Sequence, residues 1–343
     1  MLEPQRKLGK KPATLHDVAA YCGISYQTVS RVINGSPQVS AKTRQRVTDA
    51  IKVLNYQPNK AARMLVTRRS SIIEVITFGA SYYGPAQMMS GVERAARQLG
   101  YRLMFASLEQ VAPDEVETVL ENLGVRSVDG TVIIAPIDSA VFDEIDRAYQ
   151  GIPFLKLGTL SDPHVPSVGI DQMLGSQIVT QHLINLGHTR IAEIRGPEQW
   201  HDANDRHTSW LKTLASNGLK PAGSEAGDWS AQSGYDAAKH LMENRIGFSA
   251  LVVANDQMAL GAMRALRERG LGIPGDVSVV GFDDIPEAAF FEPPLTTVRQ
   301  DFAAMGQQAV EYLAQIIEDP HTPPHPQVLY PELIIRRSTR AIR

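Results

Sequence analysis

Four side chains stand where a hydroxyl-rich ligand could reach them. Asn255 and Asp283 each follow a strand-like run, Arg206 opens a predicted helix beyond another such run, and Trp229 lies in a short polar loop. Charged groups make hydrogen bonds about twice as strong as neutral ones, so a carboxylate and a guanidinium suit vicinal hydroxyls. The residue types and their positions predict a binding site rather than a reaction centre.

Each of these residues also has a purely structural interpretation. Arg206 could form a surface ion pair, Asp283 could cap a helix, and Trp229 could fill a core. Asp283 and Asp284 are adjacent in the sequence and could suggest a metal or acid–base site, although a solvated loop or a ligand contact is favoured. The nine histidines lack metal-ligand spacing, and neither a Gly-rich phosphate loop nor His-Glu-x-x-His occurs. We predict no enzyme, no metal and no cofactor.

From residue 71 onward, the elements that must hold these residues alternate between strand-like and helical patterns of apolar residues. Short β-branched runs alternate with helical segments, at 72–76, 87–99, 131–134, 171–186, 251–253 and 257–269. This alternation predicts parallel sheets covered by helices, with ligands bound beyond the carboxyl ends of strands and between two lobes.

Composition limits where such a protein could work. The chain has 343 residues, enough for two or three domains, and its single cysteine, Cys22, excludes an intrachain disulfide. The polar start lacks an apolar leader, and no apolar run approaches the ~20 residues of a membrane span. We therefore predict a cytoplasmic protein with no membrane partner.

Charge is distributed unevenly along the chain. The first 69 residues hold 13 Lys and Arg against three acidic residues, whereas the remainder holds 21 basic and 34 acidic residues. A basic head on an acidic body is typical of a polyanion-binding module joined to a domain of another kind. A solvated basic tail is the alternative, but the regular apolar spacing of this head argues against it.

The basic head has the pattern of a helix-turn-helix. A predicted helix over 15–22 is followed by Gly23, which supplies the tight turn. Ser25 is the N-cap candidate of the second helix and Ser40 that of the third.

The second helix, over 26–33, has an inner apolar stripe and a polar outer face. That outer face presents Tyr26, Gln27 and Arg31. In a major groove, Gln pairs with adenine and Arg with guanine. These three residues are the predicted base readers.

The head resembles the DNA-binding headpiece of the lactose/galactose repressor family. The resemblance covers 14–58, with Ser-Tyr-Gln-Thr-Val-Ser-Arg-Val at 25–32 and Val-Ser-Ala-Lys-Thr-Arg at 39–44; His16 departs from the tyrosine of a close family member. It assigns base reading to the same three residues. It also implies phosphate contacts, which position the protein without specifying sequence, by Ser25, Thr28, Asn34, Ser40 and Thr43.

The segment over 55–65 resembles the hinge helix of the same family. The resemblance implies that this helix orders on operator DNA and that two copies enter the minor groove, where Leu65 is wedged between base steps. Asn59 and Ala62 are the other implied hinge contacts. An ordinary linker helix, with Leu65 packed on the core, is the structural alternative.

The body resembles the same family and the related periplasmic sugar-binding proteins, through motifs at 186–192, 253–261, 281–284 and 294–297. The implied fold is an α/β, two-lobed parallel-sheet domain preceded by an all-α headpiece. The implied divisions are a headpiece over 1–58, a hinge over 59–70, an amino lobe over 71–170 and 299–328, and a carboxy lobe over 171–298 and 329–343.

The resemblance implies a transcriptional repressor that binds a palindromic operator as a homodimer and is released by a small sugar, galactoside-like, between its lobes. The implied effector contacts are Arg206, Trp229, Asn255, Asp283, Gln300 and Phe302. Gly158 stands where a close family member carries an aspartate, and the segment 78–85 also differs. The ligand therefore stays open, and a regulator with a purine or another metabolite as corepressor is the alternative.

Overall fold

The computed structural model describes residues 13–33, 36–56, 69–108, 128–136, 151–158, 160, 163–244 and 246–342. Two compact units make up the chain, residues 1–70 and residues 71–343. Among the described residues, no helix is long and apolar enough to cross a membrane.

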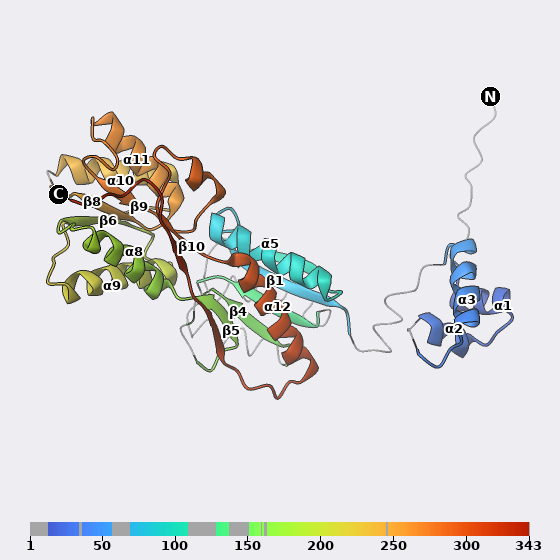
Figure 1. The fold of residues 1–343 in the computed structure, drawn as a ribbon. Coiled ribbons are helices and arrows are strands. Elements are labelled where there is room, and N and C mark those ends of the chain that lie inside the picture. The colour runs from blue at the N-terminus through green and yellow to red at the C-terminus, as the bar shows by residue number, and fades with distance from the viewer. Residues whose placement is uncertain are drawn as a thin grey trace, which may run out of the picture. The chain divides into compact units, whose positions relative to one another are not determined.

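The smaller unit is a bundle of short helices (Figure 1): α1 (Leu15–Cys22), α2 (Tyr26–Ile33) and α3 (Ala41–Val53). A capping box begins α1, because Thr14 accepts from the backbone of Asp17 while the Asp17 carboxylate accepts from the backbone of Thr14. Gly23 ends the helix at φ 57°, in the left-handed region that glycine adopts without steric cost.

The core of this unit is formed by buried side chains from all three helices and by Tyr56. Val18, Val29 and Val47 are each 0% exposed. Ile51 and Leu54 are only half-buried and pack around this core. The helix-turn-helix expectation is confirmed for the described part of the head.

The larger unit contains two parallel sheets. The amino-lobe sheet has the order β11-β5-β4-β3-β1-β2. Its strands are β1 (Ile72–Phe78), β2 (Arg102–Leu108), β3 (Gly130–Ile134), β4 (Phe154–Leu157), β5 (Ser167–Ile170) and β11 (Pro326–Leu329). The helices α5 (Tyr83–Gln98) and α12 (Phe302–Glu318) pack together on this sheet through a shared apolar core.

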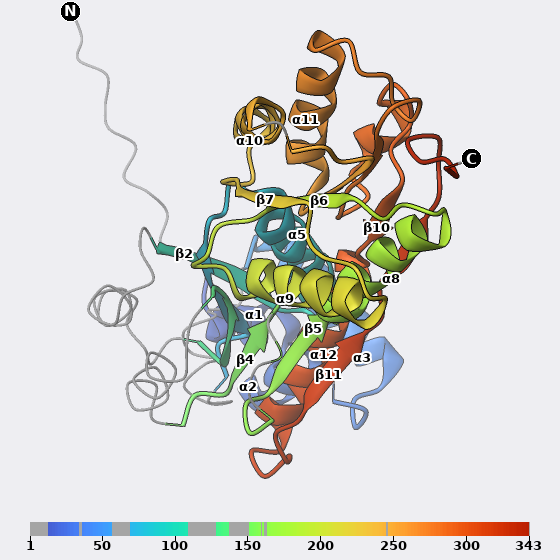
Figure 2. The ribbon, with the colours of Figure 1, turned by 90° about the vertical axis from the view of Figure 1, so that its left-hand side faces the viewer.

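The carboxy-lobe sheet has the order β7-β6-β8-β9. Its strands are β6 (Ile191–Arg195), β7 (Gly223–Ala226), β8 (Ala250–Val253) and β9 (Ser278–Val280). One face is covered by α8 (Gln172–Asn185) and α9 (His201–Ser216), and the other by α10 (Ala231–Glu243) and α11 (Asp256–Glu268), as Figures 1 and 2 show. A short 3-10 helix, η2 (Pro286–Phe290), follows β9.

The chain passes between the two sheets more than once. It leaves the amino-lobe sheet after β5, returns through β10 (Thr297–Arg299) into α12, and then adds β11 beside β5. β11 ends at Leu329, and a separate strand, β12 (Glu332–Ile334), pairs antiparallel with β10. Pro331 lies at this break and has no backbone N–H for a continuing ladder.

Candidate functional site

The predicted base readers share the solvent-facing side of α2. Tyr26 is 48% exposed, and Gln27 and Arg31 are also exposed, whereas Val29 and Val32 are buried on the opposite side. The ring of His16, on α1, stacks on that of Tyr26 at 4.8 Å between centroids. A second helix therefore supports the tyrosine on this polar face.

The predicted phosphate contacts form two similar pairs at helix starts. The Ser25 hydroxyl lies 2.9 Å from that of Thr28, and the Ser40 hydroxyl 2.9 Å from that of Thr43. Each serine oxygen also accepts from the backbone N–H of its threonine, at 3.2 Å. Both pairs thus cap helices, and the remaining predicted contacts lie outside the described residues: Asn34, Asn59, Ala62 and Leu65.

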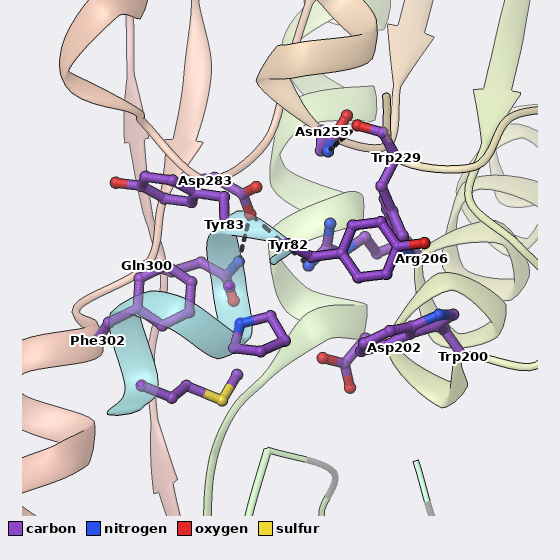
Figure 3. A pocket seen from close by; sticks show the side chains of 13 residues that line it. Tyr82, Tyr83, Trp200, Asp202, Arg206, Trp229, Asn255, Asp283, Gln300 and Phe302 are labelled. Atoms are coloured by element: carbon purple, nitrogen blue, oxygen red, sulfur yellow. Dashed lines mark hydrogen bonds and ion pairs between the residues drawn. The ribbon is translucent and has the colours of Figure 1, made fainter. Parts of the chain in front are cut away.

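A pocket of about 470 Å³ lies in the larger unit, lined by residues of both lobes (Figure 3). The six predicted effector contacts all line it: Arg206, Trp229, Asn255, Asp283, Gln300 and Phe302. They come from loops, helix starts and, for Arg206, the second turn of α9, which the sheets bring together at strand ends. The structure gathers these residues in one place, and their roles stay predictions.

A chain of hydrogen bonds links several side chains at this pocket. Arg206 Nε donates to Gln172 Oε1 at 2.9 Å, and Gln172 Nε2 donates to Gln300 Oε1 at 2.8 Å. Gln300 Nε2 then donates to Asp283 Oδ1 at 2.6 Å, and the same carboxylate oxygen lies 4.0 Å from Arg206 Nη2. The network joins Gln300, just before α12, to α8, α9 and the Asp283 loop of the carboxy lobe, and it fixes the orientation of the groups that it links.

Arg206 is buried and sits in the second turn of α9, so the prediction that it opens a helix is wrong, and so is the alternative of a surface ion pair. Its guanidinium lies 3.8 Å from the centre of the Phe282 ring and also donates to the Ala254 carbonyl. Burial lowers the pKa of Arg206, while the charge of Asp283 acts in the opposite direction. The ring and the carbonyl compensate a cation that has lost its water.

Burial raises the pKa of Asp283 to about 6, although Arg206 and the Gln300 amide oppose the shift. The carboxylate is consequently ionised at neutral pH but close to titration. Its backbone has φ 111°, and that of Asp284 has φ 54°, both in the region that costs non-glycine residues energy. Asp283 does not cap a helix; its Oδ1 accepts from Gln300 instead.

The two neighbouring aspartates serve different partners. Asp284 pairs with Arg299 at 2.7 Å and with Arg336 at 2.6 Å, away from the Gln300 amide that Asp283 accepts from. Among the described residues, no group of three His, Cys, Asp or Glu side chains is placed to hold a metal ion.

Asp256 holds the loop that carries Asp283 against the start of α11. Its two carboxylate oxygens accept from Thr297 Oγ1 at 2.6 Å and from the Ile285 backbone at 2.9 Å. Burial raises the pKa of Asp256 well above its ordinary value, and the charge of Asp283 adds to the effect. These bonds set the distance between the Asn255 and Asp283 loops.

Trp229 and Asn255 form another wall of the pocket. Asn255 Nδ2 donates to the Trp229 carbonyl at 3.1 Å, and Asn255 Oδ1 caps α11 by accepting from the Met258 backbone at 2.8 Å. Trp229 has φ 77° and is 7% exposed, so it packs in the core and lines the pocket at once. A Cβ on Gly196 would lie 2.3 Å from the Trp229 ring, which explains the glycine there.

The sequence matches known proteins over both units. Residues 14–59 match the model for bacterial regulatory proteins of the lacI family, and residues 180–339 match that for a periplasmic binding protein-like domain. The lactose operon repressor of Escherichia coli K12 is 38% identical over 331 residues, 96% of this chain and 92% of that protein. The chain belongs to the lacI family.

Solved and curated lacI-family relatives agree with this assignment. A lac repressor dimer bound to operator and the anti-inducer ONPF matches with a TM-score of 0.89 and 38% identity, over 96% of this chain and 100% of that one. A complex of the regulator CelR with cellobiose matches with a TM-score of 0.71 and 33% identity, over 95% and 99%. PurR of Haemophilus influenzae Rd is 32% identical, over 96% and 99%. The predicted family and fold class are confirmed.

Several lining residues of this lacI-family pocket escaped the sequence analysis: Tyr82, Tyr83, Gly84, Pro85, Met88, Trp200 and Asp202. Two signals could have found them. The tyrosines fall in the segment 78–85, which follows the first strand, and Trp200 follows β6 as Asn255 follows β8. Gln172 was missed as well, because a glutamine that starts a helix gives no sign of a partner 128 residues away.

Tyr83 faces the predicted contacts from the amino lobe. Its ring meets that of Phe302 edge-on at 6.0 Å, and burial, followed by the charge of Asp283, raises the pKa of Tyr83 to about 12. The phenol therefore keeps its proton at neutral pH.

Proposed function

We propose that this lacI-family repressor controls a carbohydrate-utilisation operon, binds a palindromic operator as a homodimer, and is released by a small galactoside-like sugar in the pocket between its lobes. The observation that carries the proposal is that Arg206, Gln300 and Asp283, linked by hydrogen bonds through Gln172, line one pocket with the Trp229 ring.

A sugar suits this arrangement because its ring is apolar on its faces and polar at its edge. The Trp229 ring offers an apolar wall, while the carboxylate of Asp283 accepts from hydroxyls and the Asn255 amide lies across the pocket. A polar network whose members are already fixed by one another loses little entropy when a ligand binds. The lactose operon repressor and the CelR–cellobiose complex are relatives whose names support a sugar effector.

Release follows from linkage between the pocket and the DNA-binding head. Because the pocket is built from both lobes, a bound sugar favours one relative arrangement of the lobes, and we propose that this arrangement disfavours the ordered hinge helices. If the sugar weakens operator binding by some factor, the operator must weaken sugar binding by the same factor.

Operator reading rests on the exposed face of α2. Tyr26, Gln27 and Arg31 present one hydroxyl, one amide and one guanidinium on the same side of a short helix. Arg and Gln are the side chains that form bidentate contacts with guanine and adenine in the major groove. The capped pairs Ser25–Thr28 and Ser40–Thr43 are proposed to position this helix through phosphates.

The test is a calorimetric titration of the full-length protein with galactosides, glucosides and purines, repeated with a labelled palindromic operator present. We expect a sugar to bind and to weaken operator affinity. Binding of a purine alone, with tighter operator binding, would contradict the sugar effector and indicate a corepressor of the kind that a PurR relative suggests.

A further inference from the structure

Two of the places where the chain crosses between the lobes lie side by side. β10 ends at Arg299 and leads into α12 of the amino lobe (Figure 1), while β11 of that lobe leads back into β12, which begins at Glu332. Arg299 and Glu332 are partners at the end of the antiparallel β10–β12 ladder. They are therefore the residues of this ladder that lie closest along the chain to the amino lobe, and a rotation of the lobes must bend the chain beside them.

Four charged side chains meet at this end of the ladder and are called here the crossing cluster: Asp284, Arg299, Glu332 and Arg336. Asp284 Oδ2 accepts from Arg299 Nε at 2.7 Å, and Asp284 Oδ1 accepts from Arg336 Nη2 at 2.6 Å. Arg299 Nη1 also lies 3.5 Å from Glu332 Oε2. Acidic and basic groups alternate through the cluster, so every member has a partner of opposite charge.

The inner half of the crossing cluster is fixed to the carboxy lobe, and its outer half is exposed. The side chains of Asp284 and Arg336 are 7% and 17% exposed, and Arg336 also donates to the Leu295 carbonyl at 2.8 Å. The side chains of Arg299 and Glu332 are 48% and 69% exposed. Exposed ion pairs contribute little to stability, so Arg299 can leave the cluster at small cost. Asp284 then keeps Arg336 as its partner, and no buried carboxylate is left without one.

The crossing cluster is connected to the pocket through neighbouring residues of the chain. Asp283 accepts from Gln300 at the pocket. Their chain neighbours, Asp284 and Arg299, pair with each other in the crossing cluster. The backbone N–H of Asp283 donates to the Val298 carbonyl at 2.8 Å, which holds the two segments together. A ligand that displaces Asp283 or Gln300 therefore also displaces an ion pair.

From this placement we propose that the crossing cluster is an ion-pair latch, which stabilises one arrangement of the lobes and opens when the lobes move to another. Arg299 is the member that leaves, because it lies on a crossing and is the more exposed partner of Asp284. The latch sets the equilibrium between the arrangement that the sugar favours and the one that the operator favours. The inference rests on the proposed function, since it takes sugar and operator to favour different arrangements.

Weakening the latch should change the two affinities in opposite directions. The apparent affinity of a ligand is proportional to the fraction of the protein in the arrangement that the ligand binds. A variant that shifts the equilibrium raises one fraction and lowers the other. A variant that only damages the fold lowers both affinities, so the direction of the two changes separates a latch from a structural role.

The experiment measures both affinities of the full-length protein, by calorimetry with methyl β-galactoside and by fluorescence anisotropy with a labelled palindromic lactose operator. In Arg299→Gln we expect one affinity to rise and the other to fall, by roughly three- to tenfold. Arg299→Lys keeps the charge and should recover part of both changes. Arg337→Gln, at an exposed arginine next to Arg336, is the matched control and should change neither affinity.

The tryptophan emission gives a readout that needs no sugar. Trp200, at the start of α9, meets the amino-lobe rings of Tyr82 at 5.7 Å and Phe78 at 5.5 Å, so its surroundings change when the lobes move. We expect Arg299→Gln to shift the emission spectrum of the protein. The same substitution made together with Trp200→Phe should give no shift.

The outcomes distinguish the latch from the proposed function. Two unchanged affinities, or two affinities weakened together, would overturn the latch and leave the sugar effector standing. If methyl β-galactoside does not bind the wild-type protein, the proposed galactoside effector fails. The latch is then decided by the operator affinity and the Trp200 emission of Arg299→Gln: a change in both supports it, and a failure of either to change overturns it.

Discussion

Lowering the pH should weaken effector binding through Asp283. The pKa of this buried carboxyl is about 6 in the unliganded chain. A sugar hydroxyl donates to the ionised carboxylate, so the complex favours the charged form and the Asp283 pKa falls when the sugar binds. The affinity should therefore be constant well above pH 6 and fall as the pH drops through that value.

The size of the effect follows from the fraction ionised. At about pH 5 a group with a pKa of about 6 is roughly one-tenth ionised, so the apparent Kd should rise roughly tenfold relative to about pH 8, or about 1.4 kcal/mol. About half a proton should be released per sugar bound near pH 6, provided that the pKa in the complex lies well below that value.

Calorimetry in buffers of different ionisation enthalpy measures both quantities. Asp283→Asn should bind the sugar weakly at every pH, because the amide is neutral throughout and has lost the charged contact. Asp236→Asn, on an exposed part of α10, is the matched control and should keep the wild-type profile. A wild-type affinity that stays flat from about pH 5 to about pH 8, without proton release, would refute the reasoning.

The same group should change stability in the opposite direction when no sugar is present. Folding raises the Asp283 pKa from 3.8 to about 6, so its contribution is fully present below the lower value and lost as the pH rises through the upper one. The loss is about 3 kcal/mol in the free energy of unfolding. Urea denaturation of wild type and Asp283→Asn should show the difference between them shrinking or reversing as the pH rises, and a constant difference would contradict this.

Three substitutions test other parts of the structure. Gly196→Ala should displace the Trp229 ring, cost about 1–3 kcal/mol of stability and weaken sugar binding, measured by thermal unfolding and calorimetry; an unchanged sugar affinity would show that the ring is not a contact. Gln27→Ala should cost about 1–3 kcal/mol of operator binding and relax one base position, measured by competition between operator variants, while equal wild-type affinity for a scrambled palindrome would remove the basis of this expectation. Gly261→Ala should lower the free energy of unfolding by several kcal/mol or prevent folding, because its Cβ would overlap the Ala231 carbonyl of the packed helix α10. Wild-type stability of this variant in urea would show that α10 and α11 can move apart without cost.

Local features of this protein could be predicted from its sequence because their causes are local. The 3.6-residue period places Tyr26, Gln27 and Arg31 on one face of α2 whatever surrounds the helix. Gly23 ends α1 because its own φ of 57° suits glycine. The alternation of strand-like and helical runs likewise predicts parallel sheets, and with them the edge at which Asn255 and Asp283 would lie.

Which side chains meet in the pocket was decided only by the tertiary structure. Gln172 bonds Gln300 across 128 residues, and Tyr83 meets the Phe302 ring, because the chain crosses between the sheets and brings α8, α5 and α12 to one place. Burial is also non-local. Arg206 is buried because other segments pack around α9, and burial by distant segments also raises the pKa of Asp283. The sequence alone contains the residue types of the site, but their partners and their burial arise only when distant segments pack together.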